Sequence, residues 1–171
     1  SLLAVSVFAE IEKEFGRHLP LALLFNAPTI AGLAGNLGVV EPGTPNWPSL
    51  VPIQSRGSKP RFFCVHGAGG NVLLYRALSL HLGDDYPFYG LQSRGLDGRS
   101  KPLITIPEMA AAYLEEIRRF QPHGPYCLGG YCLGGSIAME IAQLLREQGE
   151  EVGVEVPEQG ASTSTRSILP A

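Results

Sequence analysis

The feature that most constrains this sequence is the short segment Gly130-Tyr131-Cys132-Leu133-Gly134. It ends an apolar run and precedes residues with helical spacing, which predicts a strand, a sharp turn and a helix. A residue displayed at such a turn adopts a strained backbone, and large neighbours would crowd it. Gly130 and Gly134 supply the small neighbours, and Cys132 is the residue displayed.

A turn of this kind would give Cys132 a chemical role. The backbone N–H of Leu133 and the start of the following helix would point toward a carbonyl under attack, where negative charge develops. A thiolate is a strong nucleophile, so cysteine suits this position. The alternative is that Cys132 is a small buried residue in a glycine-rich turn. The local sequence leaves both interpretations open.

Composition excludes several classes of function. The chain of 171 residues has a formal net charge of −3, so no nucleic-acid or membrane partner is expected. Its three cysteines, Cys64, Cys127 and Cys132, lack the paired spacing of a zinc site or a disulfide framework. We therefore expect no metal and a reduced, cytoplasmic compartment. Charged residues soon interrupt the apolar start of the chain, which argues against a secretory signal or a spanning helix.

Two short amphipathic helices are predicted before residue 40. Apolar residues recur at helical spacing over residues 2–15 and again over residues 30–37, with an apolar loop at 19–25 between them. Residues 41–59 are rich in proline and glycine and are predicted to be a linker. The expected inner faces are Ala4, Phe8, Ile11 and Phe15, then Ile30, Leu33, Ala34 and Leu37.

Residues 60–152 alternate between strand and helix patterns. Strands are predicted at 62–65, at 88–91 and just before Gly130, each followed by a helix, the second of which spans 106–120. This order is typical of a mostly parallel sheet in an α/β fold, with helices on both faces and a site at the carboxyl ends of the strands. The expected inner faces are Leu73, Leu74, Ala77, Leu78 and Leu82 for the first helix, and Ile137, Ile141, Leu144 and Leu145 for the last.

A second glycine-rich loop, His66-Gly67-Ala68-Gly69-Gly70, follows the first of these strands. It lacks the glycine spacing and the acidic partner of a dinucleotide site, so no nucleotide is expected. The histidine is interpreted as a structural residue hydrogen-bonded near the site, with a role as general base as the alternative.

The segment around Cys132 resembles the nucleophile elbow of the α/β-hydrolases, with cysteine where serine is usual. More specifically, residues 60–152 resemble the amino-terminal half of a type I thioesterase domain of nonribosomal peptide and polyketide synthetases. That resemblance rests on segments 66–70, 89–98 and 121–135. It implies release of an acyl or peptidyl chain through Cys132. The residues it assigns are Cys132 as nucleophile, Ala68 and Leu133 as oxyanion-hole donors, and Gly130, Gly134, Gly67 and Gly69 as the glycines of elbow and loop.

Residues 1–40 look like the last helices of a peptidyl or acyl carrier domain, in which Ser1 would carry 4'-phosphopantetheine. The implied partners are upstream synthetase modules with their carrier domains, a phosphopantetheinyl transferase and an acyl or peptidyl thioester. Alternatively, Ser1 only caps a helix. A non-catalytic carrier fragment is the second candidate function. An esterase or lipase is a third, although it would have no use for a carrier segment.

The remainder of the expected machinery is missing from this sequence. Elbow hydrolases place an acid and then a histidine after the nucleophile, but all four histidines precede Cys132. Residues 153–171 are polar and of low complexity, so a divergent, disordered tail is expected, and Glu158 is a poor candidate acid. With its start at Ser1 rather than methionine, the chain is expected to be a piece of a longer protein, truncated or frame-shifted, with little turnover alone.

Overall fold

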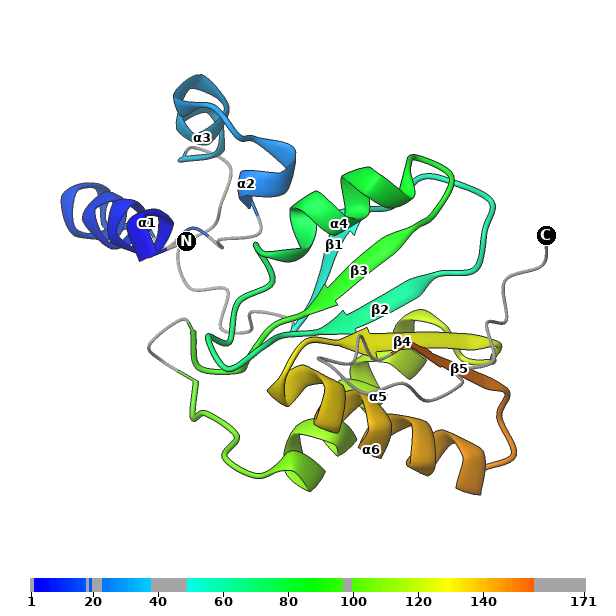
Figure 1. The fold of residues 1–171 in the computed structure, drawn as a ribbon. Helices are drawn as coiled ribbons and strands as arrows, with labels where there is room; N and C mark the ends of the chain where they lie inside the picture. Colours follow the sequence, from blue (N-terminus) through cyan, green and yellow to red (C-terminus); the bar gives the residue numbers. More distant parts are fainter. Residues whose placement is uncertain (1, 18, 20–22, 38–48, 97–99, 156–171) are drawn as a thin grey trace.

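The computed structural model describes residues 2–17, 19, 23–37, 49–96 and 100–155 (Figure 1). Ser1, the expected attachment residue, and most of the expected tail lie outside these ranges. The elements in chain order are α1 (Leu2–Phe15), α2 (Leu23–Asn26), α3 (Ile30–Leu37), β1 (Leu50–Gln54), β2 (Phe62–Val65), α4 (Tyr75–Leu82), β3 (Phe88–Leu91), α5 (Ile106–Phe120), β4 (Tyr126–Gly130), α6 (Leu133–Glu147) and β5 (Val152–Glu155).

The five strands form one sheet in the order β1-β3-β2-β4-β5. Strand β1 is antiparallel to β3, and the other neighbours are parallel, so the prediction of a mostly parallel sheet is confirmed. Val65, the last residue of β2, is in register with Leu91 of β3 and with Gly130 of β4. The loops that follow these three strands therefore begin at one edge of the sheet.

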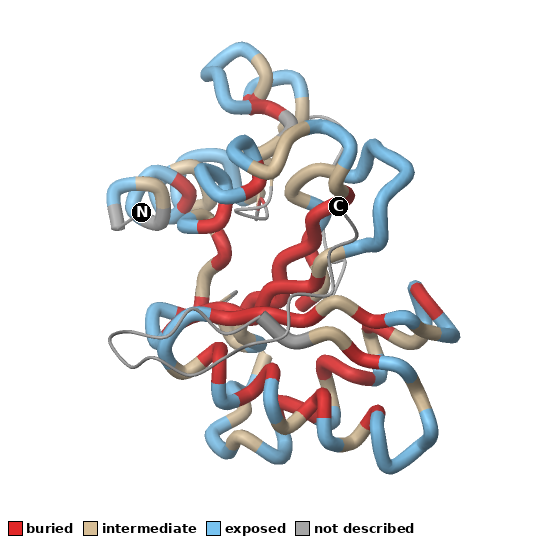
Figure 2. The backbone as a smooth tube through the Cα atoms, turned by 45° about the vertical axis from the view of Figure 1, so that its right-hand side comes forward, coloured by how far each residue is buried: buried red, intermediate tan, exposed pale blue. Residues whose placement is uncertain are grey.

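Helices cover both faces of the sheet, as predicted: α4 lies on one face, and α5 and α6 lie on the other (Figure 1). The larger apolar core is on the side of α5 and α6, where Tyr113, Ile117, Ile137 and Ile141 are fully buried against the strands. A smaller cluster, which includes Tyr75, joins α4 to the other face. Figure 2 shows buried residues concentrated along the strands.

The expected helix at 106–120 is confirmed as α5, and its start has a clear local cause. Thr105 is the N-cap: its hydroxyl accepts the backbone N–H of Glu108 at 3.4 Å and donates to the Glu108 carboxylate at 2.8 Å. Pro107 sits in the first turn, where its missing N–H costs nothing. The buried stripe runs through Met109, Tyr113 and Ile117 at helical spacing.

Two strands lie where none was predicted. Strand β1 falls inside the expected linker 41–59. It was missed because Pro52 breaks a strand pattern, but Pro52 lies on an edge strand next to a register shift, where proline is tolerated. Strand β5 overlaps the expected tail 153–171 and pairs with β4. Its Gly153 weakened the strand signal.

The inner face predicted for α4 is wrong in part: the predicted Leu82 packs against the buried cluster that includes Tyr75, but two other predicted leucines do not. Leu74 and Leu78 are 48% and 43% exposed, whereas Tyr75 and Ser79 are buried. Leu74 and Leu78 are four positions apart, as are Tyr75 and Ser79, so either pair could mark the buried face. The polar Ser79 favoured the wrong pair.

Helices α1 and α3 confirm the two helices predicted before residue 40, while α2 lies in the segment expected to be a loop. Phe8, Leu19 and Leu33 form a small core between them. Phe15 and Ile30 were expected inside but are 62% and 88% exposed. Phe25 of α2 packs against the α4 cluster of the sheet.

Candidate functional site

Cys132 occupies the junction between β4 and α6, and its side chain is exposed. Its φ of 56° and ψ of −121° are unusual, and among the residues that the structure describes no other non-glycine residue has a positive φ. Such strain persists only where the surroundings impose it, and it clusters at functional sites. The interpretation of Cys132 as a small buried residue is therefore wrong.

The two glycines that flank Cys132 are required by close backbone contacts. A Cβ atom on Gly130 would lie 2.3 Å from the carbonyl carbon and oxygen of Gly134. A Cβ on Gly134 would lie 2.3 Å from the carbonyl oxygen of Val65 and 2.5 Å from that of His66. Both distances are far below van der Waals contact, so the elbow packs directly against the end of β2.

The glycine-rich loop after β2 differs in detail from what the sequence indicated. Gly67 and Gly69 have room for a methyl group, since the nearest atoms to an added Cβ are 3.5 Å and 3.7 Å away. The glycine that the loop requires is Gly70, whose φ is 74° and whose Cβ would lie 3.1 Å from that of Ser93. Ala68 is exposed at the tip.

The loop and the elbow meet at the carboxyl edge of the sheet. Strands β2 and β4 end in register at Val65 and Gly130, and the contact between Gly134 and the His66 carbonyl joins the segments that follow. Ala68 and Leu133 therefore lie on neighbouring segments. Their roles as oxyanion-hole donors stay predictions.

His66 is buried and holds this loop in place. Because a carbonyl only accepts, the Nδ1–H of His66 donates to the Gly67 oxygen at 2.7 Å, and Nε2 then accepts the Tyr113 hydroxyl proton at 2.9 Å. Burial raises the pKa of Tyr113 to about 12, so its proton stays in place. With both ring nitrogens occupied, His66 fits the interpretation of a structural histidine rather than that of a general base.

The stability of the fold should depend on pH through His66. Burial lowers the pKa of His66, and the hydrogen bond to Gly67 only partly offsets this. As the pH falls below about 6.5, the unfolded chain takes up a proton that folded His66 resists, so the free energy of unfolding should decrease. Urea unfolding between about pH 7.5 and pH 5.5 should show a smaller decrease in His66→Gln than in the wild type.

The matched control for this measurement is His81→Gln, at an exposed position on α4. It should keep the wild-type pH dependence. An equal loss of pH dependence in both variants would contradict the role given to His66.

Cys64 is buried under α4 and should be inert. Burial raises its pKa to about 12, against a smaller opposing effect of the hydrogen bond to Tyr75. Because the thiolate is the reactive form, iodoacetamide at about pH 8 should modify the exposed Cys132 and spare Cys64 until urea unfolds the chain. Peptide mass mapping checks this, and native labelling of Cys64 as fast as that of Cys132 would contradict it.

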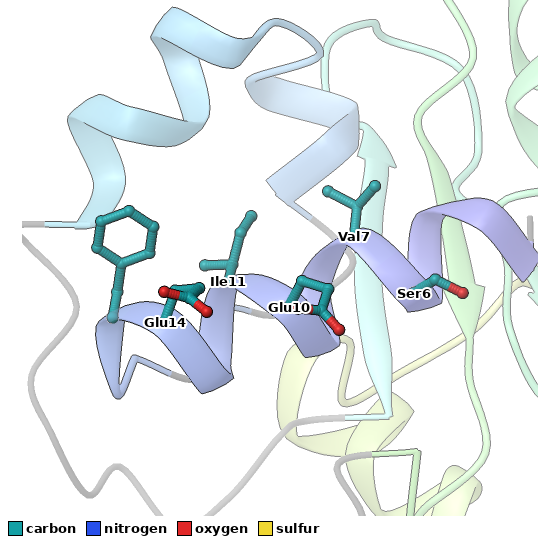
Figure 3. Close-up of a pocket in the computed structure, with 6 residues that line it drawn as sticks. Ser6, Val7, Glu10, Ile11 and Glu14 are labelled. Carbon is teal, nitrogen blue, oxygen red and sulfur yellow. The ribbon is translucent and has the colours of Figure 1, made fainter.

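Cys132 lines neither of two cavities on the described surface of the chain. One cavity, of about 360 Å³, runs along α1, where Val7 and Ile11 point toward the other carrier-like helices (Figure 3). The second, of about 440 Å³, is polar and lies at the opposite, amino-terminal edge of the sheet. Neither cavity is lined by a residue of the elbow or of the glycine-rich loop. Among the described residues, no group of His, Cys, Asp or Glu side chains is arranged to hold a metal ion.

Comparison with known protein families identifies the family to which the chain belongs. The family model described as "Thioesterase domain" matches residues 60–154, more than half of the chain. The chain belongs to the thioesterase domain family. A second model, "Phosphopantetheine attachment site", matches residues 1–37. A carrier segment followed by a thioesterase domain is the arrangement found in nonribosomal peptide synthetases, as the sequence predicted.

Curated relatives of this thioesterase include long synthetases. The dimodular nonribosomal peptide synthase of Bacillus subtilis is 44% identical over 90% of this chain, and malpinin synthetase of Mortierella alpina is 43% identical over 90% of it. The chain spans only 6% and 2% of their respective lengths.

Solved structures show the same fold. A four-domain nonribosomal peptide synthetase, holo-AB3403, aligns with 96% of this chain and 13% of its own length, at 30% identity and a TM-score of 0.62. The NocB thioesterase domain aligns with 56% of this chain and 43% of its own, at 32% identity and a TM-score of 0.52. By family, the chain is thus a thioester hydrolase with an α/β-hydrolase-like sheet. None of the helices within the described part of the thioesterase has the length and apolar character needed to cross a bilayer.

Three residues that contact the segments of the thioesterase site were not predicted: Gly70, Tyr113, and Tyr75, whose hydroxyl bonds to the backbone of Val65 and Tyr131. Each acts through partners on distant segments, such as the pair His66 and Tyr113, which are 47 positions apart. A tyrosine inside an apolar helix stripe was the available signal, since a buried hydroxyl needs a partner.

Proposed function

We propose that this chain accepts an acyl or peptidyl group from a phosphopantetheine thioester onto the sulfur of Cys132, as the release domain of a nonribosomal peptide synthetase. The observation that carries the proposal is the exposed Cys132 in a left-handed conformation, with Gly130 and Gly134 packed against the backbone around it.

The proposed step exchanges one thioester for another. The Cys132 thiolate attacks the carbonyl carbon, and the resulting oxyanion accepts hydrogen bonds from the backbone N–H groups of Leu133 and Ala68. When the intermediate collapses, the bond to the pantetheine sulfur breaks, and pantetheine leaves as a thiolate that takes up a proton. The acyl group remains on Cys132.

Hydrolysis of this acyl-enzyme requires a base to activate water. Within the 171 residues no histidine follows Cys132, and His66 has both ring nitrogens engaged. We therefore propose that the 171-residue chain stops at the acyl-enzyme.

The proposal is tested by measuring how much free pantetheine is released per protein chain. Incubated with an excess of an acyl-pantetheine thioester, the chain should release about one equivalent of free pantetheine and then stop. Continuous turnover, or no release at all, would contradict this account.

A second function is favoured by the match of residues 1–37 to the phosphopantetheine attachment model. Ser1 would carry the group, and it immediately precedes α1, whose amino terminus favours a phosphate. In this proposal residues 1–40 are the carrier segment, and upstream modules and a phosphopantetheinyl transferase are its partners. Incubation with such a transferase and coenzyme A should add one phosphopantetheine to the wild type and none to Ser1→Ala.

A further inference from the structure

Strands β2 and β4 separate at the point where the site begins. The N–H groups of Phe62 and His66 donate to carbonyls on the side of β3, at 2.9 Å and 2.8 Å. The backbone N–H and C=O groups of successive residues point to opposite sides of a strand. The N–H and C=O of Val65 therefore point toward β4. With Val65 in register with Gly130, a regular parallel ladder would join the Val65 carbonyl directly to the N–H of Tyr131.

A side chain occupies the place of that ladder bond. The Tyr75 hydroxyl donates to the Val65 oxygen at 2.5 Å and accepts the N–H of Tyr131 at 3.1 Å. Tyr75 is only 3% exposed. The Tyr75 hydroxyl thus bridges the two backbone groups whose direct bond would have continued the hydrogen-bond ladder between β2 and β4.

The two bridged residues, Val65 and Tyr131, directly precede the segments that carry the proposed site residues. Val65 is followed by the loop that contains Ala68, and Tyr131 is followed by Cys132 and Leu133. We propose that Tyr75 is a positioning residue whose inserted hydroxyl sets the separation between the oxyanion loop and the nucleophile elbow. This inference rests on the proposed role of Cys132 as nucleophile.

The environment of Tyr75 keeps its hydroxyl in one place. Its ring lies 6.1 Å from that of Phe88, between centroids, and belongs to the same buried cluster as Val72. The Cys64 side chain is hydrogen-bonded to the same hydroxyl. Because interiors pack tightly, this ring has little freedom to move, which suits a spacer.

The test compares two reactions of Cys132 in Tyr75→Phe. Acylation by an acyl-pantetheine thioester passes through an oxyanion, whereas alkylation by iodoacetamide does not. Loss of the spacer should slow acylation by about tenfold or more, because the donors are displaced, and should change alkylation by less than about twofold. A purely structural weakening would affect both reactions or neither, and either of those outcomes would overturn the proposal.

Tyr126→Phe is the matched control. Tyr126 is also buried, and its hydroxyl donates to the Gln121 carbonyl at 2.9 Å at the other end of β4. The same chemical change there should leave both Cys132 reactions within about twofold of the wild type. A tenfold loss of acylation in this control would overturn the assignment to Tyr75.

A measurement independent of catalysis separates this inference from the proposed function. Hydrogen exchange of the Tyr131 amide should be at least about tenfold faster in Tyr75→Phe, and unchanged in Tyr126→Phe. Fluorotyrosine at position 75, which keeps the ring and weakens the acceptor, should also speed this exchange. If wild-type Cys132 is never acylated, the proposed function fails. Unchanged exchange of the Tyr131 amide in Tyr75→Phe would overturn the bridge, whatever the acylation result.

Discussion

Replacing Cys132 with alanine is expected to slow covalent acyl transfer to this chain by about 10³-fold or more, because the attacking sulfur is removed. Cys132→Ser should be almost as slow. A serine hydroxyl needs a general base to become a nucleophile, and no histidine follows position 132 in this sequence. The rate is measured as the growth of acylated protein, by intact mass, after mixing with an acyl-pantetheine thioester.

Cys127→Ala is the control for this prediction. Cys127 lies on β4, five positions before the elbow residue, and is half-buried. The same change there should leave the acylation rate within about twofold of the wild type. Wild-type acylation in Cys132→Ala would show that another residue receives the acyl group.

Replacing Gly134 with alanine is expected to destabilise the fold by about 3 kcal/mol or more. The added methyl group would overlap two backbone carbonyls, those of Val65 and His66, which cannot turn away as a flexible side chain could. Relief would require α6 and β2 to move apart. Urea unfolding monitored by circular dichroism gives the change in free energy.

Gly69→Ala serves as the comparison for stability. It lies in the adjacent loop, where an added Cβ meets only the Asn71 amide at 3.7 Å. Its free energy of unfolding should stay within about 0.5 kcal/mol of the wild type. Equal stability of the Gly134 and Gly69 variants would mean that the elbow does not pack against β2 as described.

The elbow could be predicted from sequence because its determinants are local. Gly130 and Gly134 flank the nucleophile at fixed spacing, and a strand pattern and a helix pattern adjoin them. The same holds for α5, whose cap, proline and apolar stripe all lie within its own segment. At these positions the local sequence preferences agree with the global fold, which is typical of natural sequences.

The parts that could not be predicted depend on contacts between distant segments. Strand β1 exists because its pairing with β3 outweighs the presence of Pro52. Tyr75 was missed because its role appears only when Val65 and Tyr131, 66 positions apart in the chain, are brought together by the sheet. The loop requires glycine at position 70 rather than at Gly67 or Gly69, because Gly70 has a φ of 74° and an added Cβ would lie 3.1 Å from that of Ser93, in the loop after β3.

The central claim is that Cys132 receives the acyl group, and tandem mass spectrometry of the acylated chain tests it most directly. After brief exposure to an acyl-pantetheine thioester and proteolysis, the acyl mass is expected on Cys132 in the peptide that carries the elbow, at about one equivalent per chain. An acyl adduct on Cys127, Cys64 or a lysine, with Cys132 unmodified, would contradict the account.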